Sequence, residues 1–323
     1  MQKKPTFKDV LKARRVIEKY LYRTPLYQYP ALSKMLGCEL YIKHENHQPT
    51  GAFKIRGGIN LISQLSETEK RRGVITASSG NHGISVSYAS RLFGVQAKVV
   101  LPEGANPGKA EFIESLGAEL IYYGKLFDEA REYAERLAKD EGYRYIHPAD
   151  EPKLIAGVGT HTLEILEDLP DVNMIIVPVG GGTGACGASI VVKSLAPDVE
   201  VIATQAEKAP AVYRSWKEGR IVEAEMETFA DGLATKTGYE LTLHILKELL
   251  DDFVLVSEEG MLQAIALLFH KTHNLAEGAG AASLAAAIKL KDRLQDKNVA
   301  IILTGGNITP ESLQRALTHS KAQ

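Results

Sequence analysis

Short β-branched runs alternate with longer amphipathic segments along the whole chain, and no other feature of the sequence constrains its fold more strongly. The runs are "ELYIK", "GVITAS", "AKVVLP", "AELIYY", "YRYIHP", "MIIVPV", "VEVIATQ", "DFVLVS" and "VAIILTG". Segments with a helical period, such as "FDEAREYAERLAKDEG" and "GMLQAIALLFHKTHNL", lie between them. Strands that alternate with helices pair in parallel, because each helix carries the chain back to the same edge of a sheet. The sequence therefore predicts an α/β fold in which helices cover both faces of parallel sheets.

The expected strands fall into two groups along the chain. One group runs from "GVITAS" to "YRYIHP", and the other begins at "MIIVPV". The 323 residues suffice for one large or two ordinary α/β domains. Two groups of strands predict two lobes with a cleft between them, which is where α/β proteins tend to bind ligands.

Composition and charge exclude several classes of protein. The net charge of −2 at pH 7 gives no basic field for nucleic acid or for an anionic membrane. No apolar run approaches the roughly 18 residues that a membrane span needs, and "MQKKPTFKDV" lacks a signal-peptide core. Cys38 and Cys186 have no metal-like spacing, so we expect buried free thiols in a reduced setting. These observations predict a soluble, cytoplasmic protein.

A single lysine stands among small residues in "ENHQPTGAFKIRGG", residues 45–58. Gly51 and Ala52 precede Lys54 closely, and a second glycine pair follows it. Small residues allow another molecule to approach the backbone, while Phe53 would form a wall beside the amine. A solvated surface lysine, the ordinary interpretation, would need no such setting.

The stretch "VPVGGGTGACG", residues 177–187, follows an expected strand and opens an expected helix. Gly182, Gly184 and Gly187 satisfy the dinucleotide pattern, which is a weak signal by itself. The next strand closes on Gln205 rather than on an acidic residue, and this argues against NAD. Consecutive glycine N–H groups beside a helix N-terminus instead favour a site for one phosphate. A merely tight turn remains the alternative.

Two further turns also follow expected strands. In "TASSGNHGISVS", Ser78, Ser79 and Asn81 offer hydroxyl and amide groups where a helix begins, which suits an anion such as a carboxylate. Helix caps, and a structural role for His82, are the alternatives there. The other turn, "LTGGNITP", joins a hydroxyl to two glycines, and a simple turn would explain it alone.

Taken in order, these stretches resemble the pyridoxal-phosphate enzymes of the tryptophan synthase β-subunit fold, called fold type II. Within that family the chain is most similar to the threonine/serine dehydratase and serine racemase group. "ENHQPTGAFKIRGG" matches the lysine motif, "SSGNH" the substrate-carboxylate loop, "PVGGGTG" the phosphate loop and "LTGGN" the turn beneath the pyridine ring. "IAGVGT", "ADG" and "AEGAGA" are supporting matches, so the resemblance covers nearly the whole chain.

The resemblance implies a two-lobe α/β fold in which each lobe is a mostly parallel sheet flanked by helices. The large lobe, which binds the cofactor, would comprise residues 1–52 and 150–323. The small lobe, which carries the substrate-carboxylate loop, would comprise residues 53–149. A homodimer or higher homo-oligomer is the family expectation.

The resemblance also assigns roles to particular residues. Lys54 would hold pyridoxal 5'-phosphate as a Schiff base and later act as the base that removes the α-proton. Both roles need a pKa pulled toward neutrality by desolvation and neighbouring cationic groups. Phe53 would pack on or beside the cofactor ring. The cofactor phosphate would bind backbone N–H groups of Gly180, Gly181, Gly182, Thr183 and Gly184.

Other roles concern the substrate and the far end of the ring. Asn81 would hydrogen-bond the ring hydroxyl, while Ser78 and the amides of Ser79 and His82 would bind the substrate carboxylate. Thr304 replaces the family's usual serine beside the pyridine nitrogen. A neutral hydroxyl there makes the ring a weaker electron sink, which favours loss of a β-substituent.

The resemblance implies a dehydratase, or ammonia-lyase, that converts a β-hydroxy-L-amino acid such as threonine or serine into a 2-oxo acid and ammonia. The alternatives are a serine or aspartate racemase, a β-replacement enzyme of the cysteine synthase kind, and a non-catalytic ligand-binding relative. Racemisation needs a second proton-carrying group on the opposite face of the cofactor. In the family this group is the second serine of "SSGNH", which is Ser79 here.

The sequence departs from the family pattern at a few positions. Gly83-Ile84 replaces the common Ala-Gln after "SSGNH", which would make the substrate end more apolar. Gln205 and Ala211 stand where relatives of serine racemase carry two carboxylates for a divalent cation. We therefore expect no metal, although Glu207 leaves a different site open.

Overall fold

The computed structural model describes residues 3–78, 80–125 and 127–321 of the chain. Ser79, the residue expected to distinguish racemase from dehydratase, lies outside the described residues. The described chain contains a six-stranded and a four-stranded sheet. We call the parts of the molecule built on these sheets the large lobe and the small lobe.

The six-stranded sheet has the order β1-β2-β10-β7-β8-β9. Its strands are β1 (Leu26–Gln28), β2 (Glu39–His44), β7 (Met174–Pro178), β8 (Glu200–Ala206), β9 (Asp252–Val256) and β10 (Asn298–Leu303). All neighbouring strands pair in parallel except β1, which is antiparallel to β2. β1 was not predicted from the sequence, because it has three residues and none of them is buried.

The four-stranded sheet has the order β5-β4-β3-β6, and its strands all pair in parallel. Its strands are β3 (Val74–Ala77), β4 (Ala97–Leu101), β5 (Glu119–Tyr122) and β6 (Arg144–Tyr145). The predicted α/β fold with mostly parallel sheets is confirmed. The exact lobe boundaries at residues 53 and 149 stay a prediction.

Helices connect the strands and cover the sheets. They are α1 (Phe7–Ile17), α2 (Pro30–Leu36), η1 (Glu45–His47), α3 (Lys54–Ile62), α4 (Glu67–Arg72), α5 (Asn81–Phe93), α6 (Pro107–Ser115), α7 (Phe127–Glu141), α8 (Pro152–Val158), α9 (Thr160–Asp168), α10 (Thr183–Leu195), α11 (Ala211–Glu218), η2 (Asp231–Leu233), α12 (Glu240–Leu249), α13 (Glu258–Thr272), α14 (Gly278–Lys289), α15 (Lys291–Leu294) and α16 (Pro310–Lys321). None of the described helices is long and apolar enough to cross a membrane.

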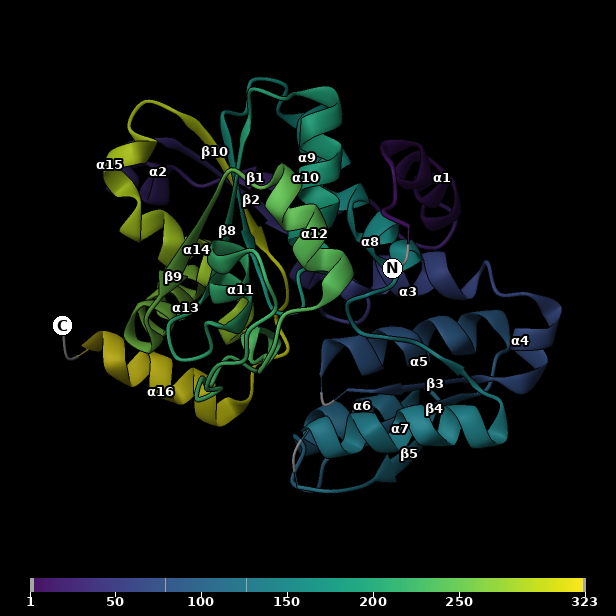
Figure 1. Cartoon of the computed structure of the whole chain (residues 1–323). Coiled ribbons are helices and arrows are strands. Elements are labelled where there is room, and N and C mark those ends of the chain that lie inside the picture. Colours follow the sequence, from purple (N-terminus) through teal and green to yellow (C-terminus); the bar gives the residue numbers. More distant parts are fainter. Residues whose placement is uncertain (1–2, 79, 126, 322–323) are drawn as a thin grey trace.

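Helix α3 and helix α8 lie where the two lobes meet. Figure 1 shows the small lobe at the lower right, with α5, α6 and α7 around its strands, and the large lobe above it and to the left. Helix α3 packs against both α5 and α8. One apolar core runs through this junction, since it joins Ile55 and Ile84 to Ile155 and Ala185. The lobes are therefore joined by buried apolar contacts as well as by the chain.

The order of the large sheet decides which loops come together. Strands β2, β10 and β7 are parallel neighbours, so their carboxyl ends meet at one edge. The segment that leads to Lys54 follows β2, Thr304 follows β10, and the glycine loop that begins near Gly180 follows β7. Three motifs that are far apart in the sequence thus share one edge of the sheet.

Candidate active site

Backbone hydrogen bonds tie the lysine segment to the turn after β10. The N–H of Phe53 donates to the carbonyl of Thr304 at 2.9 Å, and the N–H of Gly306 donates to the carbonyl of Gly51 at 2.9 Å. Gly51 has a φ of 69°, and a Cβ there would lie 2.4 Å from Asn307 Oδ1. Only glycine fits this position without a shift. These contacts fix the start of α3 against the sheet edge.

Lys54 begins α3, and its amine points toward the glycine loop. Its Nζ donates to Thr183 Oγ1 at 2.9 Å and to the carbonyl of Pro148 at 3.4 Å. Burial lowers the pKa of Lys54 from its ordinary value to about 8. The neighbouring cationic groups expected from the sequence are not the cause, since desolvation of the amine explains the shift. A lysine with such a pKa is available in its neutral form near physiological pH.

The ring of Phe53 lies beside the amine of Lys54, as the sequence predicts. Its ring centroid is 5.4 Å from Lys54 Nζ, and it makes an edge contact with His161 at 6.0 Å. A Cβ added at Gly184 would lie 3.3 Å from the ring of Phe53. The ring of Phe53 therefore packs against His161 and the start of α10.

The loop 180–184 is shaped to receive an anion. Gly182 has a φ of 93° and caps α10, and a Cβ at Gly180 would lie 2.1 Å from the carbonyl oxygen of Gly232. Among the described residues, none accepts a hydrogen bond from the backbone N–H groups of this loop. Free N–H groups at a helix N-terminus attract a phosphate through both hydrogen bonds and the helix dipole. The loop fits the phosphate of the expected cofactor.

The substrate-loop motif follows β3 and starts α5. The hydroxyl of Ser78 accepts hydrogen bonds from the N–H groups of Gly80 at 3.2 Å and Gly83 at 2.9 Å. Ser78 therefore caps the helix, which was the alternative to its expected role in binding a carboxylate. Asn81 and His82 form the first turn of α5, so their backbone N–H groups belong to the free N-terminus of the helix.

His82 is buried, and burial favours its neutral form. Burial is the main cause that lowers its pKa to about 3, and the charge of Lys54 adds to it. Thr76 Oγ1 donates to the carbonyl of Ile146 at 2.8 Å, so Nε2 of His82 donates to Thr76 at 3.1 Å. Its Nδ1 is then a buried acceptor that has no partner among the described residues. The expected role of His82 toward a carboxylate therefore depends on its backbone N–H and not on a positive charge.

Asn81 is held by two residues to which the sequence analysis gave no role. Its Nδ2 donates to Glu277 Oε1, and its Oδ1 accepts from Asn307 Nδ2 at 2.8 Å. Both partners stand in motifs that signal the family, "AEGAGA" and "LTGGN". One amide proton of Asn81 stays available for the ring oxygen of a cofactor, because Glu277 takes only the other.

Thr304 is buried, as a residue beneath a cofactor ring would be, with 5% of its surface exposed. Ile84 is fully buried within the apolar core that joins the lobes. Thr304 lies in the turn after β10, and Ile84 lies on α5, which begins at the substrate-loop motif.

Gln205 stands where relatives of serine racemase are expected to carry a carboxylate for a divalent cation. Gln205 Oε1 accepts from the N–H of Tyr213 at 3.0 Å, and its Nε2 donates to Thr235 Oγ1 at 3.1 Å. Glu207, the residue left open for a different site, pairs with Lys289 at 3.3 Å. Within the described part of the chain, no group of three or more potential metal ligands is found. Metal independence remains a prediction.

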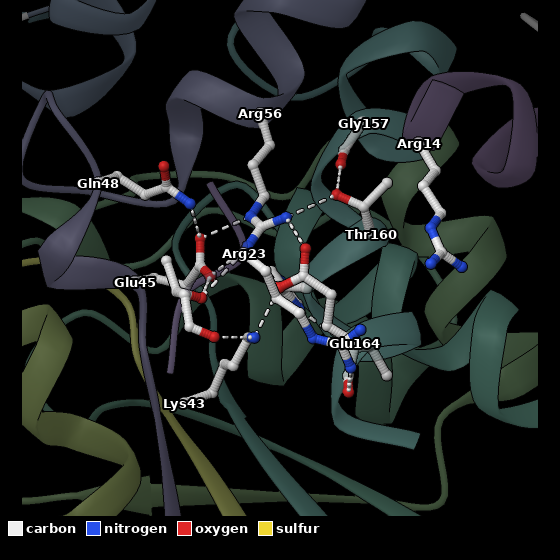
Figure 2. Close-up of polar contacts among 12 residues, drawn as sticks. Arg14, Arg23, Lys43, Glu45, Gln48, Arg56, Gly157, Thr160 and Glu164 are labelled. Carbon is white, nitrogen blue, oxygen red and sulfur yellow. Dashed lines mark hydrogen bonds and ion pairs between the residues drawn. The ribbon is translucent and has the colours of Figure 1, made fainter. Parts of the chain in front are cut away.

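Arg56, a residue of α3, is the centre of a buried charge network, which Figure 2 shows. Arg56 donates to both oxygens of Glu45 at 2.8 Å and to the two oxygens of Glu164 at 2.7 and 2.8 Å. Its remaining N–H reaches Thr160 at 3.1 Å, so all five donors are used. Lys43 adds a contact of 2.6 Å to Glu164. We call these residues the Arg56 network.

The Arg56 network keeps its charges although it is shielded from water. Burial acts to lower the pKa of Arg56, but the carboxylates of Glu45 and Glu164 outweigh it and raise the pKa. Because Glu45 follows β2 and Glu164 lies on α9, the network pins the start of α3 to the large lobe. The network was not predicted from the sequence, although Glu45 and Arg56 flank Lys54 in the lysine motif.

Comparisons with known proteins agree with this geometry. The family model described as "Pyridoxal-phosphate dependent enzyme" matches residues 17–305. The L-threonine ammonia-lyase of Thermotoga maritima is 42% identical over 313 residues, which are 97% of this chain and 78% of that protein. The processed form of threonine deaminase isoform 2 from Solanum lycopersicum has a TM-score of 0.92 at 33% identity, over 99% of this chain and 96% of that one. Serine racemase from Dictyostelium discoideum has a TM-score of 0.88 at 38% identity, over 94% of this chain and 99% of that one.

The motifs, the parallel strand order and the free N–H groups of the glycine loop all agree with these similarities. The family expected from the motifs is thereby confirmed: the chain belongs to the pyridoxal-phosphate dependent enzymes of fold type II.

Proposed function

We propose that the protein is an ammonia-lyase that converts a β-hydroxy-L-amino acid, L-threonine or L-serine, into a 2-oxo acid and ammonia. The observation that carries the proposal is the Lys54 amine, which has a lowered pKa and lies 2.9 Å from Thr183 at the phosphate loop. The similarity to an L-threonine ammonia-lyase over 97% of the chain supports the choice of reaction.

Binding and orientation fall to residues from both lobes. The N–H groups of loop 180–184 would bind the cofactor phosphate, and Lys54 would hold the cofactor covalently through Nζ. Asn81 would donate its free amide proton to the cofactor, and Thr304 would offer it a neutral hydroxyl. The N–H groups at the start of α5 would bind the substrate carboxylate.

Lys54 also moves the proton. Bound pyridoxal phosphate draws electrons away from the α-carbon of an amino acid, which makes its α-proton acidic. Once its amine is free and neutral, Lys54 takes that proton at Nζ. Loss of the β-hydroxyl as water, followed by uptake of one water, gives the 2-oxo acid and ammonia, so the substrate is deaminated without a net oxidant.

The test measures 2-oxo acid from purified protein loaded with cofactor. L-Threonine, L-serine and bulkier β-hydroxy amino acids are compared, and the Lys54→Ala variant serves as the blank. Release of a 2-oxo acid from at least one of these substrates by the wild type alone supports the proposal. A wild type that releases none of it would overturn the proposal.

A racemase is the second candidate, and the similarity to the serine racemase of Dictyostelium discoideum favours it. Incubation of L-serine in deuterated water, followed by chiral analysis, separates the two activities. Formation of D-serine faster than 2-oxo acid would replace lyase by racemase as the main function. Loss of the D-enantiomer reaction in Ser79→Ala would assign the second proton-carrying group to Ser79.

Three finer proposals accompany the main one. We propose that the small lobe comprises residues 53–149, that the enzyme acts as a homodimer, and that it works in the cytoplasm. Cys38 and Cys186 support the last of these, because both are buried free thiols. Sedimentation of the purified enzyme tests the dimer, and a monomer at micromolar concentration would contradict it.

A further inference from the structure

Two groups from the small lobe converge on one carboxylate of the large lobe. Glu277, the residue that precedes α14, accepts the amide of Asn81 on Oε1, and its Oε2 lies 3.6 Å from Lys109 Nζ. Lys109 stands in the first turn of α6. The side chains of Lys109 and Glu277 are each only 8% exposed. Both oxygens of one buried carboxylate are thus engaged by the opposite lobe.

Lys109 has a second ion-pair partner in the large lobe. Its Nζ lies 3.3 Å from Oδ2 of Asp231, a residue of η2 that is 55% exposed. A Cβ added at Gly80 would lie 4.0 Å from the same Nζ, so the ammonium stands next to the start of α5. Burial acts to lower the pKa of Lys109, but the charges of Glu277 and Asp231 outweigh it and raise the pKa. We call Lys109, Glu277, Asp231 and Asn81 the Glu277 clasp.

We propose that Lys109 is a positioning residue of the active site, whose ion pairs with Glu277 and Asp231 hold the substrate loop of the small lobe against the large lobe. The inference rests on the proposed function only for its kinetic readout. Lys109 itself touches neither the amine of Lys54 nor the glycine loop in the contacts described above. It acts through the carboxylate that orients Asn81.

The physical argument concerns the charge of Glu277. A buried carboxylate without a countercharge is costly, and Lys109 supplies that countercharge to Glu277. Without Lys109, Glu277 would move toward water or another partner, and Asn81 would lose the acceptor that orients its amide. The two ion-pair distances of 3.3 and 3.6 Å exceed those of a tight hydrogen bond. The ion pairs of Lys109 are therefore longer and weaker than the contacts of Arg56 with Glu45 and Glu164.

Lys98 provides a matched control within the small lobe. Its Nζ also pairs with two carboxylates, Glu119 at 3.5 Å and Glu141 at 3.6 Å, and its side chain is 18% exposed. All three residues belong to β4, β5 and α7, so this pair does not cross between the lobes. Replacing either lysine by methionine removes one charge and keeps most of the length of the side chain.

Hydrogen exchange of the cofactor-loaded enzyme tests the clasp without reference to activity. In Lys109→Met we expect amides in the first turns of α5 and α6 to exchange about tenfold faster than in the wild type, as a coupling between sites of ordinary size implies. In Lys98→Met these amides should exchange as in the wild type. Equal exchange in wild type and Lys109→Met, or equal acceleration in both variants, would overturn the proposal.

Steady-state kinetics gives the second readout. We expect Lys109→Met to raise the KM for L-threonine about tenfold with a smaller change in kcat, since the catalytic amine is untouched. Lys109→Arg, which keeps the charge, should restore most of the loss. A drop in kcat alone, or no rescue by arginine, would contradict a positioning role. If the wild type shows no lyase activity at all, the proposed function fails while hydrogen exchange still decides the clasp.

Discussion

The Arg56 network and the Glu277 clasp both bury ion pairs beside the candidate active site, yet they are built differently. In the network, Arg56 is 1% and Glu45 0% exposed, and the Arg56–Glu45 contact is 2.8 Å. In the clasp, Lys109 lies 3.3 and 3.6 Å from carboxylates, one of which is 55% exposed. The network joins α3 to β2 and α9, whereas the clasp joins α5 and α6 to η2 and α14.

The difference teaches how a two-lobe enzyme combines rigidity with movement. A guanidinium with five satisfied donors cannot shift without losing several charge-assisted bonds at once. An ammonium between two carboxylates can shift with little loss of interaction energy. It acts as a compact point charge, so its attraction to a carboxylate depends little on direction. We infer that the Arg56 network holds α3, and Lys54 with it, firmly against the large lobe, while the clasp holds the substrate loop there by ion pairs that break more easily.

The largest effect is expected at Lys54, the residue that the network holds in place. Lys54→Ala removes both the covalent anchor and the base, so turnover should fall at least about 10³-fold. The melting temperature should change little, since the Arg56 network is intact. The check is 2-oxo acid release without added amines, together with the visible absorption of bound cofactor. Near-normal turnover would remove Lys54 from the mechanism.

Breaking the Arg56 network should be costly for folding. Arg56→Met leaves Glu45 buried without its partner, and we expect a loss of about 3–5 kcal/mol in the free energy of unfolding. Arg293, which pairs with Asp252 and Glu200 at the surface and is 42% exposed, is the control. Arg293→Met should cost about 0–1 kcal/mol. Urea unfolding of both variants measures the difference, and equal costs would refute the contrast.

The same measurement sharpens the comparison between the two groups. Lys109→Met should lower the free energy of unfolding by less than Arg56→Met does, because Asp231 is half in water and screens the loss. If the two variants lose equal stability, the clasp holds as firmly as the network and the inferred contrast between them is wrong.

The pH profile of turnover reports on the amine. The pKa of Lys54 is lowered to about 8, so the neutral form that accepts a proton increases as the pH rises through that value. We expect kcat to rise with pH up to about 8 and to level off above it. Initial rates between pH 6 and 9.5 measure this. A kcat that falls as pH rises from 7 to 8 would mean that the amine does not act as the base.

The smallest effect is expected from removing divalent cations. Gln205 fills the expected cation position with its amide, which bonds Tyr213 and Thr235. Treatment with a chelator should therefore leave turnover and melting temperature unchanged within error. A large loss that Mg²⁺ or Ca²⁺ restores would reveal a cation site elsewhere in the enzyme.

Much of the fold could be predicted because its signals are local. The β-branched runs became strands, and the glycine turns follow them as expected. The edge strand β1 was missed, because its three residues lack both burial and alternation. For Ser78, the sequence could not separate a ligand from a cap, and the structure shows its hydroxyl bound to helix N–H groups. A serine that binds a ligand and a serine that caps a helix would stand at the same position of the sequence.

The sequence by itself determined the elements, the family and the lysine, since each depends on residues that are neighbours in the chain. Only the tertiary structure decided the partners of the charges. Asn81 and Glu277 are 196 residues apart, and Arg56 and Glu164 are 108 apart. These pairs meet because β2, β10 and β7 lie side by side and because the small lobe folds back over their ends. Strand order is set by packing of the whole chain, so no local pattern carries it.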